Sequence, residues 1–460
     1  MTIRPTRYLA RWLLPVSSPP VRDAAVLVDA DGRIASAGPT AGVPSPDDAR
    51  TIDLGDAALL PGLVNTHAHL ELSFARGLIE DRPFPDWIAS LLQAKRLTAL
   101  DEPDLLAAAR ASCAEAIAAG ITTLAATEDS DAGFQALLET GLRGIVYREV
   151  FGPAPSQADG AVAELRGRVD SMRRRATDLV RAGISPHAPF TVSDALFERT
   201  SRYALDEDLP VAVHVAESRD EENYVVQGAG VFGDRLRARG IAVAPRSPSP
   251  VALLERTGIL RTRPLLIHCV RANPADIDRM RAAGVSVAHC PVANARLGHG
   301  IAPVTAMLEA GLTVALGSDS VASNNRMDIL EEARFAQMLQ RVIHGDATLL
   351  PAEQLLRMAT LDGARALGLD GRVGSIVPGR DADLCAVRLD GFHVKPVNDP
   401  VAALFHSARA SDVVLTVVRG RILYSDGVVH SLDAPAALKT VDALAARARA
   451  ALAGSGDTPA

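Results

Sequence analysis

The middle of this 460-residue chain alternates, over ~300 residues, between short apolar runs and longer amphipathic segments. The apolar runs have the length of buried strands, and the segments 103–119, 193–206 and 274–283 have the apolar periodicity of helices. Alternation of this kind favours βα units on a parallel sheet. The expected strands are 59–66, 121–127, 143–150, 181–187, 210–216, 264–269, 285–290 and 313–318.

About eight such units match an α/β fold of the (β/α)8 barrel type, a TIM-like barrel. An open, doubly wound sheet is the competing architecture. That fold usually carries a glycine-rich nucleotide loop after its first strand, and no such loop follows residues 59–66. We therefore expect the barrel.

The two ends of the chain have a different pattern, with short strands and tight turns. Residues 24–29, the Asp31-Gly32 turn and residues 34–38 read as a hairpin, and residues 383–387 and 413–424 look similar. We therefore expect a small composite β-sandwich from residues 1–58 and 371–435, around a catalytic barrel at 59–370. Residues 436–460 form a tail that is expected to be helical and then disordered.

Composition narrows the class of protein. The chain is 48% hydrophobic and 22% charged with a net charge of −7, which gives no sign of a nucleic-acid partner. No apolar run reaches the ~18 residues of a membrane span, and the N-terminus lacks the pattern of a signal peptide. The cysteines show no C-x-x-C spacing, so we expect a reduced, cytoplasmic protein; they are Cys113, Cys269, Cys290 and Cys385.

Metal-ligating residue types stand at the ends of several expected strands. His67 and His69 follow residues 59–66, and side chains two apart on a strand share a face, so both imidazoles can point at one site. His214 and Asp319 end two later strands. Three nitrogens and one carboxylate oxygen suit Zn2+, and Fe2+ or Mn2+ less selectively. We expect one divalent metal, with Zn2+ preferred and Fe2+ as the alternative.

Three further polar residues extend this group. Glu217 stands three residues after His214, close enough to carry a proton without binding the metal, while His187 and His268 end two other strands. Taken singly, each histidine reads as a hydrogen-bonded core residue. The carboxyl ends of parallel strands meet at one mouth, however, and active sites of barrels are built there. The joint placement therefore favours an active site.

These motifs together resemble the amidohydrolase superfamily. The matching segments are His67-x-His69, His214-x-x-Glu217, His268-Cys269, His289-Cys290-Pro291, Gly317-Ser318-Asp319-Ser320 and Ser323-Asn324-Asn325. They look most similar to the branch of cytosine deaminase and the S-adenosylhomocysteine/methylthioadenosine deaminases. The resemblance runs from about residue 55 to 385 and implies a metal-bearing barrel with a small sandwich domain.

The resemblance implies a role for each matching residue. His67, His69, His214 and Asp319 match metal ligands, with Asp319 also counted among the catalytic groups. Glu217 matches the acid that shuttles protons, His268 the histidine that orients hydroxide or polarises the reacting centre, and His187 a substrate contact. The segment HCPVANARLGHG departs from the usual HCPxSNxxL by Ala293, which puts local substrate contacts in doubt.

The lysines bear on the number of metals. Relatives with two metals usually bridge them with a carboxylated lysine at a strand end, and Lys95, Lys395 and Lys439 all lie outside the expected barrel strands. One metal is therefore favoured. The Glu217/His268 pair favours deamination, although relatives that release halide or cleave ring amides share much of this site.

Substrate residues are suggested by two segments that look like those of aminodeoxyfutalosine deaminases. The segment ELSFARGLIEDRPFPDWIASLL places Trp87 on an expected lid helix, and YREVFGP contains Arg148 and Glu149. Arg148 is a candidate for binding a carboxylate and Glu149 for ribose hydroxyls. The alternatives are a structural ion pair between Arg148 and Glu149, and a packing role for Trp87.

The leading hypothesis is a metal-dependent aminohydrolase that deaminates a purine-type nucleoside, adenosine-like or aminodeoxyfutalosine. Its partner would be a small molecule, and the sequence leaves a homo-oligomer open. One rival is an amidohydrolase acting on another heterocycle, as a chlorohydrolase or ring amidase. The other is a noncatalytic binding protein, which is disfavoured because every ligand position and Glu217 are retained.

Overall fold

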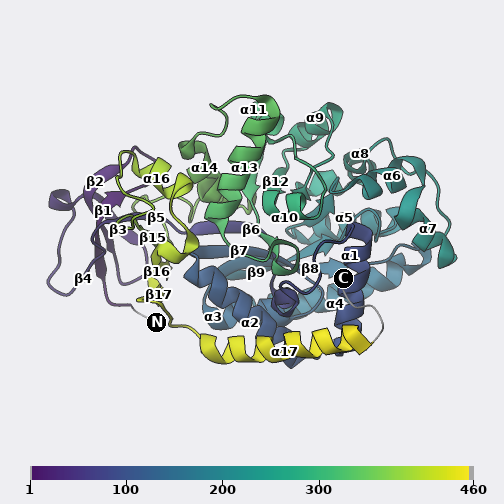
Figure 1. Ribbon diagram of the computed structural model, residues 1–460, viewed down its shortest axis with the longest axis horizontal. Coiled ribbons are helices and arrows are strands. Elements are labelled where there is room, and N and C mark those ends of the chain that lie inside the picture. Colours follow the sequence, from purple (N-terminus) through teal and green to yellow (C-terminus); the bar gives the residue numbers. More distant parts are fainter. Residues whose placement is uncertain (1–2, 455–460) are drawn as a thin grey trace.

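The computed structural model describes residues 3–454 and shows a mixed α/β fold (Figure 1). Strands from both chain ends pair into one sheet, in the order β18-β17-β16-β15-β5-β1-β2-β3 with β4 on β1. This composite sheet has its own core of apolar side chains, which includes Tyr8, Val26 and Leu415. Its strands are β1 (Thr6–Leu13), β2 (Val21–Val28), β3 (Ile34–Pro39), β4 (Arg50–Asp53), β5 (Ala57–Pro61), β15 (Leu384–Arg388), β16 (Val413–Val418), β17 (Arg421–Ser425) and β18 (Val428–Val429).

Parallel strands fill the middle of the chain in two groups, β14-β6-β7-β8-β9 and β10-β11-β12-β13. A parallel bridge between Ile184 and Val211 joins the groups at one side. At the other, β14 follows β13 after two residues and pairs with β6. The strands are β6 (Leu63–His69), β7 (Ile121–Glu128), β8 (Arg143–Val150), β9 (Val180–Pro186), β10 (Ala212–Val215), β11 (Leu265–His268), β12 (Ser286–His289), β13 (Thr313–Leu316) and β14 (Asp319–Ser320).

Helices occupy most of the connections between these strands, as the alternating sequence pattern predicts. The three helices expected from the sequence are α2, α5 and α9, each within about a residue of its expected bounds. The helices are α1 (Phe84–Thr98), α2 (Glu102–Ala118), α3 (Ala132–Thr140), α4 (Ala158–Arg175), α5 (Asp194–Glu207), α6 (Arg219–Gln227), α7 (Gly230–Ala238), α8 (Pro250–Arg256), α9 (Pro274–Ala283), α10 (Pro291–Arg296), α11 (Val304–Glu309), α12 (Val321–Asn324), α13 (Ile329–His344), α14 (Ala352–Ala359), α15 (Leu361–Ala366), α16 (Pro400–His406) and α17 (Ala434–Gly454).

The first expected strand, 59–66, is divided between two sheets. Residues up to Pro61 belong to β5 and pair with β15, whereas β6 begins at Leu63 and pairs with β7. Gly62 marks the division: a Cβ there would lie 2.1 Å from side-chain atoms of Thr122, and its N–H donates to the carbonyl of Asp383. The composite sheet therefore extends three residues past the expected boundary at residue 58.

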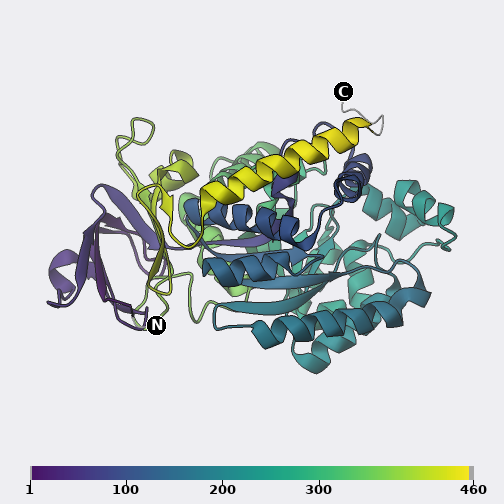
Figure 2. The same cartoon turned by 90° about the horizontal axis from the view of Figure 1, so that it is seen from below.

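The C-terminal helix α17 packs along α1 and α2, as Figures 1 and 2 show. This helix includes residues 436–454 of the expected tail, and the stretch expected to be disordered lies, from residue 455, outside the described residues. Among residues 3–454, no helix is both long and apolar enough to cross a bilayer. The division into a sandwich and a barrel stays a prediction.

Candidate active site

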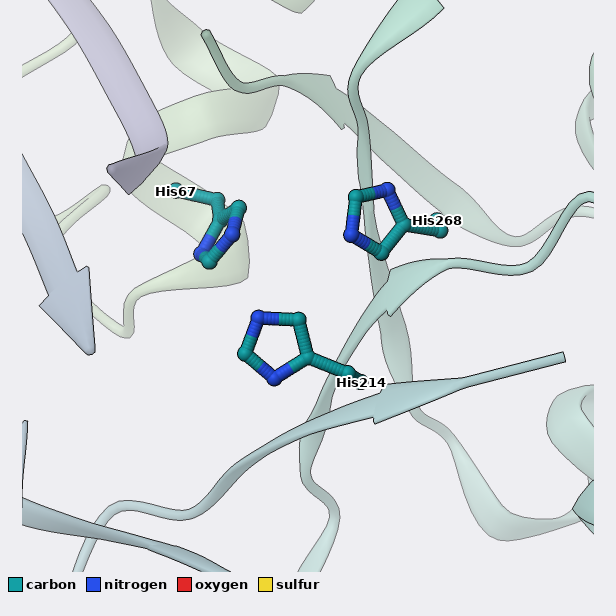
Figure 3. A group of neighbouring side chains, drawn as sticks. All are labelled: His67, His214 and His268. Carbon is teal, nitrogen blue, oxygen red and sulfur yellow. The ribbon is translucent and has the colours of Figure 1, made fainter. Parts of the chain in front are cut away.

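Donor atoms from separate strands meet at the carboxyl edge of the parallel strands. His67 and His69 come from β6, His214 from β10 and Asp319 from β14. Asp319 Oδ1 lies 3.3 Å from His67 Nε2 and 3.6 Å from His69 Nε2. His67, His214 and His268 place one ring nitrogen each within 4.8 Å of one another, and their rings surround a common space (Figure 3). The structure thus brings the predicted ligands together.

Neighbouring residues fix the position of this group. Gly317 allows the strand end to approach β6, because a Cβ there would lie 2.9 Å from the Cβ of His67. Asn65 accepts from the Ser318 N–H at 3.0 Å, and Ser323 Oγ donates to Asp319 Oδ2 at 2.9 Å. One carboxylate oxygen of Asp319 is therefore held by Ser323 while the other faces the histidines.

Backbone strain concentrates at the same edge. Ala216, His268, Cys269 and Asp319 all have φ between 50° and 73°, in the left-handed region that favours glycine. A side chain there costs of order 1–3 kcal/mol and persists only where the surrounding structure enforces it. Such strain is typical of functional sites, and here it turns Asp319 and His268 toward the group.

The histidines are held neutral. Burial lowers the pKa of His69 to about 4 and lowers the pKa of His67, while burial and the neighbouring histidines lower that of His214. His214 Nδ1 lies 3.1 Å from the carbonyl of His187, so Nδ1 carries the proton and Nε2 keeps a free lone pair. Burial raises the pKa of Asp319, but the adjacent His67, whose Nε2 lies 3.3 Å from Oδ1, outweighs it and keeps the carboxylate ionised.

This donor set fits a divalent metal. His67 Nε2 is buried without a hydrogen-bond partner, an arrangement that costs free energy unless something binds the nitrogen. Neutral imidazole nitrogens and one carboxylate are the ligands that zinc takes in catalytic sites. Backbone and hydroxyl groups hold the far sides of His214 and Asp319, as second partners of metal ligands usually do.

A carboxylate and two histidines lie beside this group. Glu217 Oε1 is 3.5 Å from His268 Nε2 and 3.2 Å from His299 Nε2. Burial would raise the pKa of Glu217, but the adjacent His268 and His299 hold it below its ordinary value. His268 Nδ1 lies 2.9 Å from Asn294 Oδ1, so its Nε2 faces Glu217.

His299 and Asn294 are site residues that the sequence interpretation missed. Both belong to the HCPVANARLGHG segment, from which the sequence analysis uses only the His289-Cys290-Pro291 match and the departure at Ala293. Asn294 lies on α10, after β12, and His299 shortly follows it. The signal that could have identified them is their place in the segment that follows an expected barrel strand, where polar side chains reach the mouth of a barrel.

A cavity of about 260 Å³ opens in front of the metal-ligand group. Trp87 lines it from α1, with its ring packed near Phe84 and its Nε1 donating to the carbonyl of Ile79 at 3.1 Å. Lys95, also on α1, lies at the cavity wall and forms a 2.8 Å ion pair with Asp129. Trp87 therefore contacts the cavity and also has a packing role.

The other predicted substrate residues divide between two places. His187 and Glu149 line the cavity, with His187 Nε2 3.9 Å from Glu149 Oε1. Arg148 is absent from the cavity lining and lies 3.7 Å from Asp131, in the wall of a second hollow that Glu149 also lines. Adjacent residues of a strand point to opposite faces, which turns Arg148 away from the main cavity that Glu149 lines. A carboxylate-binding role for Arg148 stays a prediction.

Comparison with known proteins identifies the family. The sequence profile of the amidohydrolase family matches residues 58–423. The chain is 34% identical over 427 residues to a 5-methylthioadenosine/S-adenosylhomocysteine deaminase of Moorella thermoacetica, covering 92% of this chain and 94% of the relative. The chain belongs to the amidohydrolase family. This amidohydrolase is also 33% identical over 434 residues to a 5'-deoxyadenosine deaminase of Methanothermobacter thermautotrophicus, covering 93% and 95%.

Solved structures agree with this membership. An adenosine deaminase from Xanthomonas campestris with bound zinc superposes with a TM-score of 0.85 at 28% identity, over 97% of this amidohydrolase and 98% of that chain. An atrazine chlorohydrolase from Arthrobacter aurescens with zinc gives a TM-score of 0.83 at 26% identity, over 96% and 100%. The resemblance drawn from the sequence motifs is confirmed at the level of the family.

Proposed function

We propose that this amidohydrolase is a metal-dependent aminohydrolase that removes ammonia from an adenosine-type nucleoside. The observation that carries the proposal is the buried pairing of Glu217 with His268, next to a converging set of three imidazoles and one carboxylate. A carboxylate in that position serves proton transfer at a ring amidine. The relatives named as deaminases of adenosine-type nucleosides support the same reaction.

We assign the metal to His67, His69, His214 and Asp319, whose donor atoms form the overlapping groups described above. A divalent cation, Zn2+ in the first instance, would lower the pKa of a water molecule to about 7 and so supply hydroxide at neutral pH. The bound zinc of the similar structures supports that choice of metal. All three lysines lie outside the described strands, which favours a single ion.

Side chains of the protein then transfer the protons and position the substrate. The Glu217 carboxylate accepts a proton from the water and passes it to a ring nitrogen of the substrate. His268, fixed by Asn294, stabilises the oxygen that adds to the ring carbon. His187 and Glu149, beside His214, contact the substrate, and Trp87 with its apolar neighbours on α1 covers it and excludes water.

The fold that holds these groups is, in our proposal, a closed (β/α)8 barrel with a composite β-sandwich beside it. The strand pairings support closure, because they lead in chain order from β6 to β9 and through the Ile184–Val211 bridge to β13, and β14, which follows β13 after two residues, pairs with β6. All the proposed ligands then stand at one mouth, the position in which barrels carry their active sites.

The decisive experiment combines metal analysis with an ammonia-release screen. Purified protein would be tested against adenosine, 5'-deoxyadenosine, methylthioadenosine, S-adenosylhomocysteine and aminodeoxyfutalosine. We expect about one zinc or iron per chain and ammonia release from at least one nucleoside. Removal of metal with a chelator, or His214→Ala, should abolish turnover while the far-UV spectrum and melting temperature stay near those of the intact protein. Full turnover by metal-free protein would refute the proposal.

A second candidate is hydrolysis of a chlorinated heterocycle. The observation in its favour is the likeness to the atrazine chlorohydrolase, at 26% identity and a TM-score of 0.83. The same site can expel chloride or ammonia, since both leave from a ring carbon beside a nitrogen. Chloride release from atrazine without ammonia release from any nucleoside would favour this candidate.

A further inference from the structure

His299 is a buried histidine that contacts Glu217 without lining the substrate cavity. Its side chain is 2% exposed, and Nε2 lies 3.2 Å from Glu217 Oε1. Within residues 3–454, this nitrogen has no hydrogen-bond partner, because the 3.2 Å contact is not aligned for a hydrogen bond. A buried polar atom in that state costs free energy. An ionised carboxylate can only accept, so the contact becomes favourable when His299 carries its proton on Nε2 and turns it toward Oε1.

The backbone around His299 fixes where its ring can reach. The His299 N–H donates to the carbonyl of Asn294 at 2.9 Å, and the side chain of the same asparagine lies 2.9 Å from His268 Nδ1. Gly298 and Gly300, on either side of His299, have φ of 70° and 110°, a backbone conformation that favours glycine. Asn294 therefore positions both histidines that contact Glu217.

The ring of Phe84 packs against His299. The two ring centroids are 4.5 Å apart and the ring planes lie at 89°, the edge-to-face geometry that aromatic rings prefer. Phe84 is the first residue of α1 and lines the cavity. It also faces Phe190 and Phe232, whose ring centroids are 6.4 and 6.3 Å away. The start of α1 is thus connected to Glu217 through the His299 ring.

The two histidines at Glu217 have different tasks in the proposed reaction. His268 stabilises the oxygen that adds to the ring carbon, so its Nε2 must leave Glu217 during turnover. His299 Nε2 has no other partner among the described residues and can hold Oε1 throughout. Hydrogen bonds of catalytic groups are often poorly aligned without substrate and tighten when it binds.

We propose that His299 is a positioning residue for the deamination, which donates a hydrogen bond to Glu217 Oε1 and so leaves Oε2 to carry the proton. Phe84 keeps the His299 ring in place while substrate fills the cavity. The inference rests on the proposed function and goes beyond it, because it assigns the orientation of Glu217 to a side chain outside the cavity lining. A small displacement of a reacting group lowers the rate strongly, so loss of this hydrogen bond should lower kcat.

The test compares His299→Gln with His299→Asn, two amides that differ in length by one methylene. The glutamine amide nitrogen can occupy the position of Nε2, whereas the asparagine amide ends near the position of Nδ1 and cannot reach Glu217. Ammonia release is measured on the nucleoside that the wild-type enzyme deaminates fastest. We expect kcat of His299→Asn to fall roughly 10- to 100-fold, the effect of one hydrogen bond to a charged acceptor. His299→Gln should keep kcat within about threefold of the wild-type value.

KM separates positioning from substrate binding. In His299→Asn it should change by less than about twofold, because His299 does not line the cavity. His299→Leu also lacks the donor but keeps apolar bulk against Phe84, so it should lose kcat as His299→Asn does. The matched control is His344→Asn, at an exposed histidine that ends α13, which should leave kcat unchanged.

A double-mutant cycle shows whether His299 acts through Glu217. In the Glu217→Gln background, His299→Asn should lower kcat by less than about threefold further, because the carboxylate that it positions is already absent. An equal loss in both backgrounds would overturn the inference. Wild-type kcat in both His299→Asn and His299→Leu would overturn it as well, as would a loss in His299→Gln as large as in His299→Asn.

Two other results have a different meaning for His299 and for the reaction. Loss of bound metal or of the melting transition in both His299→Asn and His299→Leu would overturn the inference, since His299 would then be a ligand or a purely structural residue. A wild-type enzyme that releases no ammonia from any nucleoside would refute the proposed function itself. An active wild-type enzyme with an unaffected His299→Asn refutes only the role of His299.

Discussion

Glu217 is held between two histidines from separate parts of the chain, with His268 at the end of β11 and His299 after α10. Glu217→Gln keeps the size of the side chain but cannot carry a proton. We expect ammonia release to fall about 10²–10⁴-fold, the usual effect of removing a general acid/base. Metal content, measured by elemental analysis, should not change, because His67, His69, His214 and Asp319 are retained.

Two outcomes would contradict that assignment. Loss of the metal in Glu217→Gln would make the carboxylate a ligand. A wild-type rate would show that protons travel by another route, with His268 as the next candidate.

Glu221 makes the free energy of unfolding depend on pH. It is buried at the start of α6 and accepts the N–H groups of Ala216 and Glu217 at 2.9 and 2.8 Å. Burial raises the pKa of this carboxyl from 4.5 to about 8. Between those pH values the folded protein keeps the proton and the unfolded chain releases it, so the free energy of unfolding decreases as pH rises through this window.

Glu221→Gln removes that titration. The free energy of unfolding is measured with urea from pH 5 to pH 8 for both proteins. We expect it to fall less for the variant than for the wild type over this range, by on the order of 1–3 kcal/mol. The variant should be less stable at every pH, because the amide nitrogen cannot accept the second N–H. Parallel declines in the two proteins would show that Glu221 does not titrate in this range.

At the scale of elements, the C-terminal helix α17 supports the wall of the cavity. It packs on α1, the helix that carries Trp87 and Lys95, and buries Leu444 and Leu452. Arg447 also forms an ion pair with Asp104 of α2. The end of the chain thus fixes a helix that lines the substrate pocket.

Leu444→Ala tests this support. Removing a buried leucine side chain should lower the free energy of unfolding by about 2–5 kcal/mol. If α17 positions α1, KM for the substrate should rise while kcat changes less. Leu438→Ala, at a position 57% exposed on the same helix, is the control and should leave both quantities near their wild-type values. Equal effects of the two variants would contradict a packing role for Leu444.

At the scale of the whole molecule, Arg143 joins the parallel strands to the composite sheet. It begins β8 and is 1% exposed, with Nε 2.7 Å from Asp383 and Nη2 2.9 Å from Asp381. Asp383 also accepts from the backbone N–H of Arg419 at 2.8 Å. Charged groups from both parts of the fold therefore neutralise each other away from water.

Arg143→Leu should lower the free energy of unfolding by about 3–5 kcal/mol, because it leaves the buried Asp383 without its counter-charge and Asp381 with only Arg372. The measurement is urea or thermal unfolding, followed by circular dichroism. Arg173→Leu, which breaks an exposed pair with Glu207, is the control and should cost about 1 kcal/mol or less. A loss for Arg143→Leu no greater than for Arg173→Leu would show that the network does not hold the two parts together.

The sequence alone determined the repeating βα units and the group of candidate ligands. Strand 143–150 was predicted with its observed bounds, because a buried run with turn signals on both sides leaves few alternatives. His67, His69, His214 and Asp319 could be predicted to meet, because side-chain alternation and the common edge of parallel strands are local rules.

Only the tertiary structure decided the contacts between residues far apart in the chain. The division at Gly62 depends on Thr122 and Asp383, and the approach of His187 to Glu149 depends on two neighbouring strands meeting. His299 lies on a loop and contacts Glu217. The sequence of this loop has no hydrophobic periodicity from which its path could be predicted. Hydrophobic periodicity specifies which face of an element is buried, whereas the partner of that face is chosen by packing of the whole chain.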